Sequence, residues 1–283
     1  MRLKRIPFRI GHYAKKIAYF KRTSSPFLSQ DTFSRVADLD LNKDFYPGVQ
    51  RVKEASVIFV NSGDSEKFFS EYGAITNAKV LIFGNNDVDF NTFDFTIPRS
   101  VKKIYLQNST IGDSFFRILP IGIESLKYVT NGVPSLFANK YIENAKNQRV
   151  LVGPFGNTHY ERQILLNKKE KSFENVDFIL ERLTPKNYAK VSSTYSYIAC
   201  PRGNGLDTHR FWESLYRGLI PVVVESPWSN YWVKKSIPII EIPSWDHNLD
   251  EIENSNLGLV KFNPLDLNVL WEPYWHRDIR QNL

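Results

Sequence analysis

The chain has 283 residues, of which 42% are hydrophobic and 24% are charged, values typical of a soluble globular protein with room for two domains. Residues 1–22 hold eight Lys or Arg and no Asp or Glu, and taking these eight charges from the formal net charge of +7 leaves −1 for the rest. The positive excess is therefore confined to a basic arm. Because the sequence also shows no zinc-knuckle or RNA-recognition motif, a basic nucleic-acid-binding domain is excluded.

The basic arm has apolar residues at helical spacing, including Tyr13, Ile17 and Phe20, with lysines on the other faces. This pattern predicts an amphipathic helix that lies on an anionic membrane leaflet or packs on its own domain. The polar stretch 23–41 has no clear periodicity, so residues 1–45 are interpreted as an arm followed by a linker. No run reaches eighteen apolar residues and no secretory signal is apparent, and the single cysteine, Cys200, fits a reducing compartment. We therefore expect a cytoplasmic protein, peripheral at the inner membrane if the arm binds lipid.

The next segment, residues 46–145, is predicted as a first α/β domain. Apolar runs indicate strands at 55–61 and 78–85, with a helix over 66–72 between them. Further strands are expected at 104–108 and 118–123. The crossing to the second domain is expected within 129–148, where turn residues gather.

The remaining residues, 146–283, alternate strands and helices more regularly, which predicts a mostly parallel, doubly wound sheet. The expected strands are 149–153, 176–180, 197–200, 220–224 and 237–242, and the expected helices are 158–167 and 185–193, with a further helix between the strands at 200 and 220.

The most informative stretch is 197–224, where two buried strands flank a loop with the sequence PRGNGLD and a helix. Asp207 or Thr208 can cap that helix, whose free N–H groups then face the loop and favour an anion. A second glycine loop, GPFGNTHYER, follows the strand at 149–153 and carries Arg162. Ligands of open α/β sheets bind beyond the carboxyl ends of the strands, so both loops are expected at one phosphate site.

The helix after the PRGNGLD loop carries a pattern that resembles the nucleotide-sugar half of exostosin-like glycosyltransferases. The matching residues are Arg210, Glu213, Gly218, Ile220 and Pro221, and weaker matches cover 104–124 and 150–162. The resemblance implies a GT-B-like fold, with two Rossmann-like domains facing across a cleft. It also implies inverting transfer of a sugar from a nucleotide-sugar donor to a glycan or lipid-linked glycan acceptor, as in surface or capsular polysaccharide synthesis, without a cofactor or essential metal.

Candidate site residues follow from these motifs. Guanidinium groups can hold a departing diphosphate, and Glu213 can accept hydrogen bonds from ribose or sugar hydroxyls, although a salt bridge to Arg210 or Arg217 is its alternative role. A base for the acceptor hydroxyl is expected in the first domain, at Asp64, Asp87 or Glu124, each of which follows a predicted strand. The expected donor-binding residues are Gly153, Asn157, Arg162, Arg202, Asn204, Gly205, Thr208, Arg210 and Glu213.

Three other functions remain open from the sequence. A polysaccharide pyruvyltransferase would use a similar architecture and a phosphorylated anionic donor. A GT-A glycosyltransferase would hold a divalent metal on Asp87 and Asp89, although the five histidines form no pair at ligand spacing and no metal site is expected from them. A glycan-binding scaffold would keep the fold without turnover. All six tryptophans lie between 212 and 275, and burial is expected for them before sugar stacking.

Overall fold

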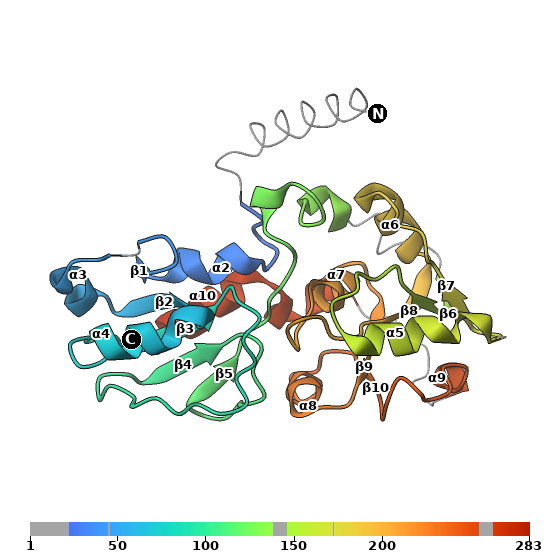
Figure 1. The fold of residues 1–283 in the computed structure, drawn as a ribbon. Coiled ribbons are helices and arrows are strands. Elements are labelled where there is room, and N and C mark those ends of the chain that lie inside the picture. The colour runs from blue at the N-terminus through green and yellow to red at the C-terminus, as the bar shows by residue number, and fades with distance from the viewer. Residues whose placement is uncertain (1–22, 45, 138–145, 172, 255–262) are drawn as a thin grey trace, which may run out of the picture.

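The computed structural model describes residues 23–44, 46–137, 146–171, 173–254 and 263–283, and the predicted arm helix lies outside them. It contains two five-stranded sheets, one from each half of the chain, and every strand pair in both sheets is parallel (Figure 1). The α/β class and the parallel sheets are therefore confirmed. None of the described helices is both long and apolar enough to cross a membrane.

The first sheet has the order β1-β2-β3-β4-β5, so its strands follow one another in sequence without a reversal. Apolar runs form these strands because both faces of a parallel sheet are covered. The strands are β1 (Leu39–Asp40), β2 (Val57–Asn61), β3 (Val80–Gly84), β4 (Lys103–Leu106) and β5 (Phe116–Ile118), and the helices around them are α2 (Gln30–Val36), α3 (Val49–Glu54) and α4 (Ser65–Tyr72).

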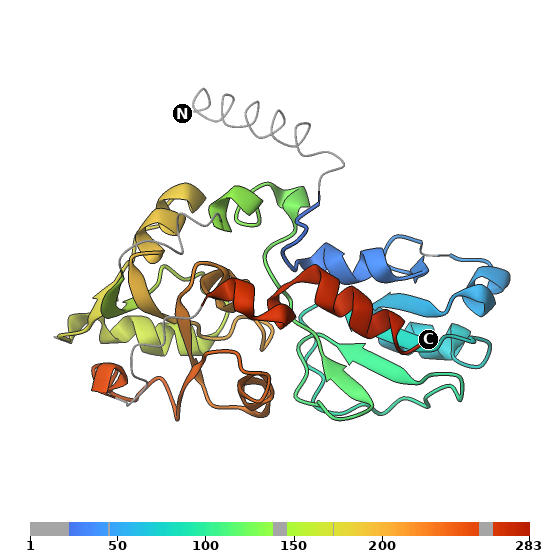
Figure 2. The ribbon, with the colours of Figure 1, turned by 180° about the vertical axis from the view of Figure 1, so that it is seen from behind.

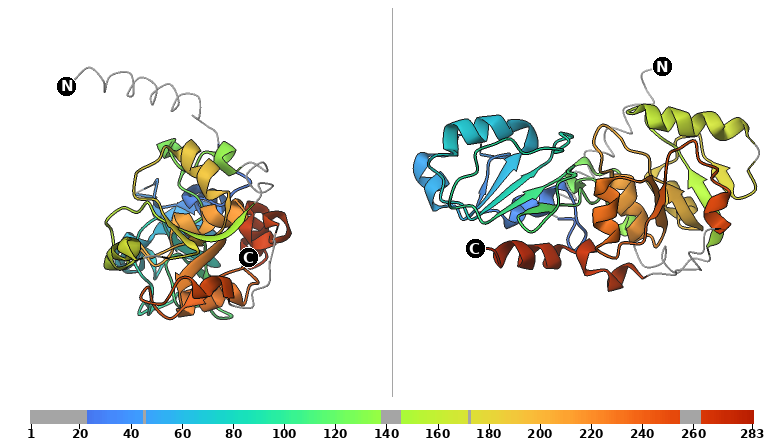
Figure 3. Two further views of the ribbon diagram at one scale, coloured as in Figure 1. Left: turned by 90° about the vertical axis from the view of Figure 1, so that its right-hand side faces the viewer. Right: turned by 90° about the horizontal axis from the view of Figure 1, so that it is seen from below.

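Alternate residues of β2 enter different cores, as the two-residue period of a strand requires. Val57 and Phe59 point to the side of α2, whereas Ile58 and Val60 pack with Phe68 of α4. Seen from below, the sheet lies between α4 on one side and α2 with the C-terminal helix on the other (Figure 3).

The second sheet has the order β10-β9-β8-β6-β7, so the chain moves to β7 on one side of β6 and then returns to β8 on the other. The loops after β6 and β8 therefore diverge, which makes their carboxyl ends the topological switch point of the sheet. The strands are β6 (Asn147–Val152), β7 (Val176–Phe178), β8 (Tyr195–Ala199), β9 (Ile220–Val224) and β10 (Ile240–Ile242), and the helices are α5 (Tyr160–Asn167), α6 (Pro185–Ser192), α7 (His209–Tyr216), α8 (Pro227–Val233) and α9 (Glu251–Asn254).

The last helix, α10 (Glu272–Arg280), returns to the first half of the molecule (Figure 2). Trp275 packs against Phe33 of α2 with ring centroids 5.9 Å apart. Glu272 accepts a hydrogen bond of 2.8 Å from Arg35, and Asp278 accepts one of 2.7 Å from the Tyr105 hydroxyl of β4. The second half is therefore tied to the first by a helix that follows it in sequence. Short 3₁₀ turns lie at Ser62–Asp64, Leu126–Tyr128, Pro134–Phe137, Lys168–Glu170, Pro264–Asp266 and Asn268–Leu270.

Two predictions about these elements were wrong. The stretch 23–41 contains α2 and β1 instead of an irregular linker, because its periodic apolar signal is limited to Phe33 and Val36 on one short helix. The apolar run 118–123 is mostly not a strand and shares one residue with β5. Pro120 lacks the N–H that hydrogen-bonding to a neighbouring strand requires, and Gly122 has a φ of +68°. This segment therefore continues as a buried loop. The predicted burial is confirmed for Trp212, Trp228, Trp232, Trp245 and Trp275, and for the Cys200 thiol.

Candidate functional site

A pocket of about 680 Å³ lies at the switch point of the second sheet. Its walls come from the loops after β6, β7 and β8 and from the start of α7. The first half closes it with residues that include Asp87 and Ile121, so the pocket is shared by the two halves. Ligands of open α/β sheets bind at such a position, and the volume is within the usual range of small-molecule sites.

Two arginines dominate the electrostatics of this pocket. The guanidinium of Arg210 lies 4.5 Å from the ring centroid of Phe155 and 5.4 Å from that of Tyr188, and that of Arg162 lies 5.9 Å from the Phe155 ring. Burial, followed by repulsion from Arg210, lowers the pKa of Arg162. Within the described chain neither arginine pairs with a carboxylate, and the buried Nη1 of Arg210 has no hydrogen-bond partner.

The hydrogen bonds of the two arginines run to backbone carbonyls, which hold the side chains without neutralising them. Arg162 donates from Nε to the carbonyl of Arg202 at 2.9 Å and from Nη1 to that of Gly156 at 3.2 Å. Arg210 donates to the carbonyl of Pro154. Two cations held close together without a directly ion-paired carboxylate favour a bound anion with several acceptor oxygens, such as a phosphate or diphosphate.

The first turn of α7 supplies further positive potential. Thr208 is the N-cap residue, and its hydroxyl makes no capping hydrogen bond. Thr208, His209 and Arg210 all line the pocket. The N-terminus of a helix carries a partial positive charge and unsatisfied N–H groups, so this turn and the two arginines favour the same kind of ligand.

Glu213 lies one turn further along α7 and also lines the pocket. It is 7% exposed, and its Oε2 is 3.8 Å from Nη1 of the buried Arg217. Burial raises the pKa of Glu213, and attraction to Arg217, His209 and Arg210 opposes this rise. The structure thus gives Glu213 both the ion pair and the pocket-facing position that the sequence left as alternatives.

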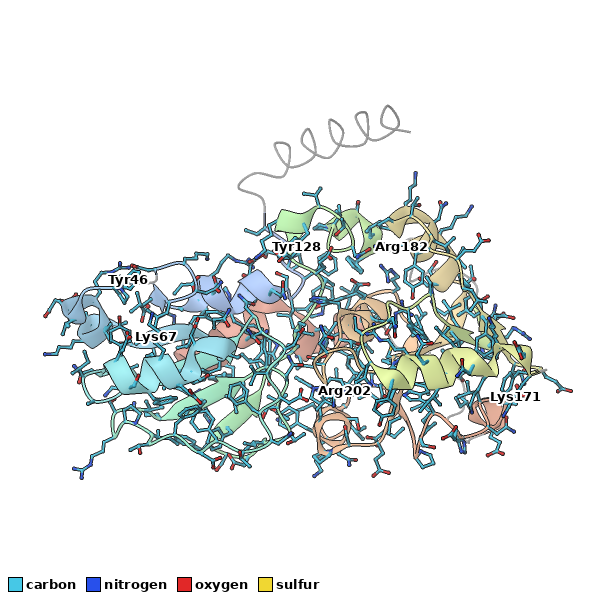
Figure 4. All side chains as sticks on the ribbon, viewed as in Figure 1. Tyr46, Lys67, Tyr128, Lys171, Arg182 and Arg202 are labelled. Atoms are coloured by element: carbon cyan, nitrogen blue, oxygen red, sulfur yellow. The ribbon has the colours of Figure 1, made fainter. Side chains whose placement is uncertain are left out.

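The loop 200–208 contacts the acidic pair Asp87 and Asp89 of the first half through polar groups. Arg202 donates to Asp89 at 2.7 Å, and the backbone N–H of Leu206 donates to the same carboxylate at 3.2 Å. Asn204 donates to Asp87 at 3.3 Å. Figure 4 shows Arg202 at the junction of the two halves.

The end of this loop is attached to the first half through buried groups. The carboxylate of Asp207 accepts from the backbone N–H of Ile121 at 2.8 Å and from the indole of Trp212 at 2.7 Å. Its own N–H donates to Asn108 at 2.9 Å. Burial raises the pKa of Asp207 to about 8, against the lowering effect of its hydrogen bonds.

His209 has a defined tautomer in this arrangement. Its Nδ1 is 2.8 Å from the carbonyl of Gly122, and because a carbonyl only accepts, Nδ1 carries the proton. The side chain of His209 also lines the pocket, so its Nε2 is the ring nitrogen left for a ligand.

At two positions in these loops, neighbouring atoms lie so close to the backbone that only glycine fits. A Cβ on Gly205 would lie 2.6 Å from Oδ1 of Asn108, so the two halves meet there without room for a side chain. Gly153 has a φ of +84°, and a Cβ there would lie 2.4 Å from the carbonyl oxygen of Ile179. Gly153 therefore shapes the turn that presents Pro154 and Phe155.

The pocket gathers most of the residues that the two motifs predict. Three predicted donor-binding residues do not line it. Gly153 shapes the turn beneath it, Asn157 is exposed and accepts from Gln163 at 3.1 Å, and Arg202 faces Asp89 and a separate smaller pocket. The predicted residues that do line it are Asp87, Arg162, Asn204, Gly205, Thr208, Arg210 and Glu213.

The three base candidates separate in the structure. Asp87 lines the pocket. Asp64 is exposed and lines a different hollow together with residues of α4. Glu124 accepts from the hydroxyl of Thr130 and from the N–H of Asn131 at 2.8 Å, so its carboxylate orders a loop.

Sequence reasoning missed the wall of the pocket that follows β7. Leu180, Leu183 and Tyr188 form its apolar part, and Arg182 lies near α6 (Figure 4). The available signal was positional, because these residues follow the strand next to β6 at the carboxyl edge.

A polar pocket of about 280 Å³ adjoins the larger one along the carboxyl edge of the first sheet. The two pockets share Gln30, Asp87 and Ile121. Its other lining residues carry amides, and the buried Oδ1 of Asn85 has no hydrogen-bond partner. Amides both donate and accept, which suits a ligand rich in hydroxyl groups. The lining residues are Gln30, Asn85, Asn86, Asp87, Gln107 and Ile121.

The acidic pair after β3, Asp87 and Asp89, makes contacts between the two halves. Asp89 forms an ion pair with Arg202, and Asp87 accepts from Asn204. In the part of the chain that the structure describes, no group of three or more His, Cys, Asp or Glu is placed to hold a metal ion. A search against known protein families finds no family model that matches this chain.

Proposed function

We propose that this protein is a glycosyltransferase with a GT-B-like arrangement that uses a nucleotide-sugar donor, as its resemblance to exostosin-like enzymes implies. The observation that carries the proposal is the pair Arg162 and Arg210, which form no ion pair with a carboxylate in the described chain and lie in the first turns of α5 and α7 at the switch point. A nucleoside diphosphate supplies the charge and the acceptor oxygens that this arrangement lacks.

In the proposed complex, the diphosphate contacts both arginines and the first turn of α7. The nucleoside extends along Leu180, Leu183 and Tyr188, where the wall is apolar. Glu213 accepts hydrogen bonds from ribose hydroxyls, because its carboxylate borders the pocket one turn beyond the diphosphate.

The acceptor glycan is proposed to occupy the amide-lined pocket, with Asp87 at the boundary between donor and acceptor. The acceptor oxygen attacks the anomeric carbon, the bond from that carbon to the diphosphate oxygen breaks, and the hydroxyl proton moves to the Asp87 carboxylate. The charge that develops on the departing diphosphate is stabilised by Arg162 and Arg210. This displacement inverts the anomeric centre, as the resemblance implies.

The proposed acceptor is a surface or capsular glycan, or its lipid-linked precursor, made at the cytoplasmic face of a membrane. Residues 1–22 would bring the enzyme to anionic lipid through their eight basic side chains. No cofactor or metal is part of the proposed reaction, since the arginines take the role that a divalent cation has in GT-A enzymes.

A thermal-shift and calorimetry panel tests the proposal. The purified chain is titrated with UDP, GDP, CMP and dTDP, with their common sugar conjugates, and with phosphoenolpyruvate. We expect one nucleotide series to bind in the micromolar to millimolar range and to raise the melting temperature. Absence of binding by every nucleotide at millimolar concentration refutes the proposal. Stabilisation by phosphoenolpyruvate alone identifies a pyruvyltransferase, and nucleotide binding without donor turnover over an acceptor panel identifies a scaffold.

A further inference from the structure

A basic surface, named the basic face, lies along one edge of the molecule and comprises residues 126–137 and 180–193. The two segments are neighbours, because the guanidinium of Arg217 lies 4.6 Å from the ring centroid of Phe137 and 5.8 Å from that of Tyr188. Their 3₁₀ turns and helix α6 form the upper edge in Figure 1, and the view turned by 90° in Figure 3 agrees. Segments that are far apart in sequence thus share one edge.

The charged residues of the basic face are mostly cations. Each of its four cations is exposed, and none forms an ion pair with a carboxylate among the residues that the structure describes. With one acid in the same segments, the basic face has a net charge of +3, whereas the whole chain after residue 22 has −1. Such a local excess attracts an anionic partner. The four cations are Lys127, Arg182, Lys186 and Lys190, and the acid is Glu181.

The basic face also exposes aromatic and aliphatic surface. Tyr128 is 48% exposed and Leu180 is 51% exposed. The Nζ of Lys127 lies 5.0 Å from the ring centroid of Tyr128, and Figure 4 shows Tyr128 and Arg182 along the same upper edge. Tyrosine is favoured at membrane interfaces, where the ring meets apolar groups and the hydroxyl stays in water. Cations mixed with exposed apolar side chains therefore fit the headgroup region of an anionic bilayer.

The chain of the basic arm joins the fold beside the basic face. Phe27 follows the first described residue, Thr23, by four positions and packs on Phe137 with ring centroids 5.6 Å apart. The eight basic residues of the arm, 1–22, directly precede Thr23 in the sequence. The arm is therefore attached to the fold at the edge that carries the basic face, and one anionic surface can contact both.

We propose that the basic face binds an anionic lipid bilayer together with the arm and thereby fixes the orientation of the folded part on the membrane. The proposal does not depend on the nucleotide-sugar reaction. Asn131, Arg182 and Pro185 of the basic face also line the pocket of about 680 Å³, so this orientation brings that pocket close to the lipid headgroups. An arm that acted alone would leave the folded part free to turn on its tether.

The test uses a triple variant of the full chain, Lys127→Gln with Lys186→Gln and Lys190→Gln, which removes three charges from the basic face and keeps the arm. None of these lysines lines the large pocket or the amide-lined pocket. The protein is sedimented with phosphatidylcholine vesicles that contain about 30% phosphatidylserine, and with vesicles of phosphatidylcholine alone. We expect the variant to lose about tenfold to 100-fold in its partition coefficient on the anionic vesicles.

A second triple variant removes the same charge elsewhere and serves as the control. Lys169→Gln, Lys171→Gln and Lys234→Gln replace exposed lysines that likewise form no ion pair with a carboxylate in the described chain. Figure 4 shows Lys171 on the lower edge, away from Tyr128 and Arg182. Since interactions with a charged surface fall off within a Debye length, this control should lose less than about threefold.

Orientation is measured with an environment-sensitive nitrobenzoxadiazole dye on a single introduced cysteine. Burial raises the pKa of the Cys200 thiol to about 12, so an exposed cysteine is labelled selectively at neutral pH. Asn187→Cys places the dye on the exposed side of α6, and Lys171→Cys places it on the lower edge. Anionic vesicles should shift the emission to the blue at position 187 and leave it unchanged at 171.

Three results overturn the proposal: equal sedimentation of the basic-face variant and the control, equal dye responses at both positions, or a wild type that does not bind anionic vesicles. Wild-type binding to a single-stranded oligonucleotide that the basic-face variant loses, without binding to vesicles, identifies nucleic acid as the partner and also overturns it. Because nucleotide binding enters none of these measurements, the proposed function stands or falls separately.

Discussion

Replacement of Arg210 with alanine is the most direct perturbation of the proposed donor site. The guanidinium stacks on Phe155 and Tyr188 and donates to the carbonyl of Pro154. Two cation–π contacts of about 0.5–1 kcal/mol each and one hydrogen bond of about 1 kcal/mol are lost, and relief of the repulsion between Arg210 and Arg162 offsets part of this loss, so the unfolding free energy should fall by less than about 2–3 kcal/mol. Losing a charged contact to the leaving diphosphate costs about 2–4 kcal/mol in the transition state, or about 30- to 1,000-fold in kcat/KM.

The assay follows release of the nucleoside diphosphate with the donor selected by the binding panel, at a temperature where both proteins are folded. Arg210→Lys should recover activity only in part, because an ammonium keeps the charge but loses the planar fork. Arg149→Ala is the control, since Arg149 lies on β6 of the same half of the chain but pairs with Asp177 at 2.6 Å outside the pocket. A fully active Arg210→Ala enzyme refutes the placement of the diphosphate. Activity that EDTA abolishes and Mn²⁺ restores favours the metal-dependent alternative at Asp87 and Asp89.

Four further predictions address the base, the junction of the two halves and the arm. Asp87→Asn should lower kcat by about 10²- to 10⁴-fold in the same assay with donor affinity unchanged, and a wild-type kcat excludes Asp87 as the base. Gly205→Ala should lower the unfolding free energy by about 1–3 kcal/mol in a urea titration, because its Cβ would lie 2.6 Å from Asn108, and unchanged stability would contradict that contact. Burial raises the pKa of Asp207 to about 8, so between about pH 4 and 8 the unfolded state releases this proton first. As the pH rises through this range, the contribution of Asp207 to the unfolding free energy should therefore fall by about 1.4 kcal/mol per pH unit. Urea titrations at several pH values measure this slope, and Asp207→Asn should remove it. Deletion of residues 1–22 should abolish sedimentation with anionic vesicles and preserve donor binding, and undiminished sedimentation would exclude the arm as the membrane contact.

The sequence was sufficient for the elements that carry a strong periodic signal. The apolar run at 220–224 is strand β9 with the same bounds, and the helix predicted at 185–193 is α6. By contrast, α2 has seven residues and β1 has two, so neither is long enough for periodicity to stand out from irregular chain.

The site was predictable where topology alone decides position. Arg162 and Arg210 meet because the loops after neighbouring parallel strands reach one edge of the sheet. The pairing of Arg202 with Asp89 depends on how the two halves are placed against each other, which no local pattern encodes. For the same reason the sequence could not show that Asp64 and Glu124 lie outside the shared pocket.

The return of α10 to the first half has a mechanical consequence. The chain passes between the halves once after Phe137 and again before Glu272, and each passage ends in packed structure. A body joined to another at two separate places cannot slide or swivel freely and retains mainly rotation about the line through both joints. The loop 200–208 lies away from those joints in sequence and connects the two halves through Arg202 and Asp207. Any opening between the halves must therefore separate these contacts and also the hydrophobic core that both halves share.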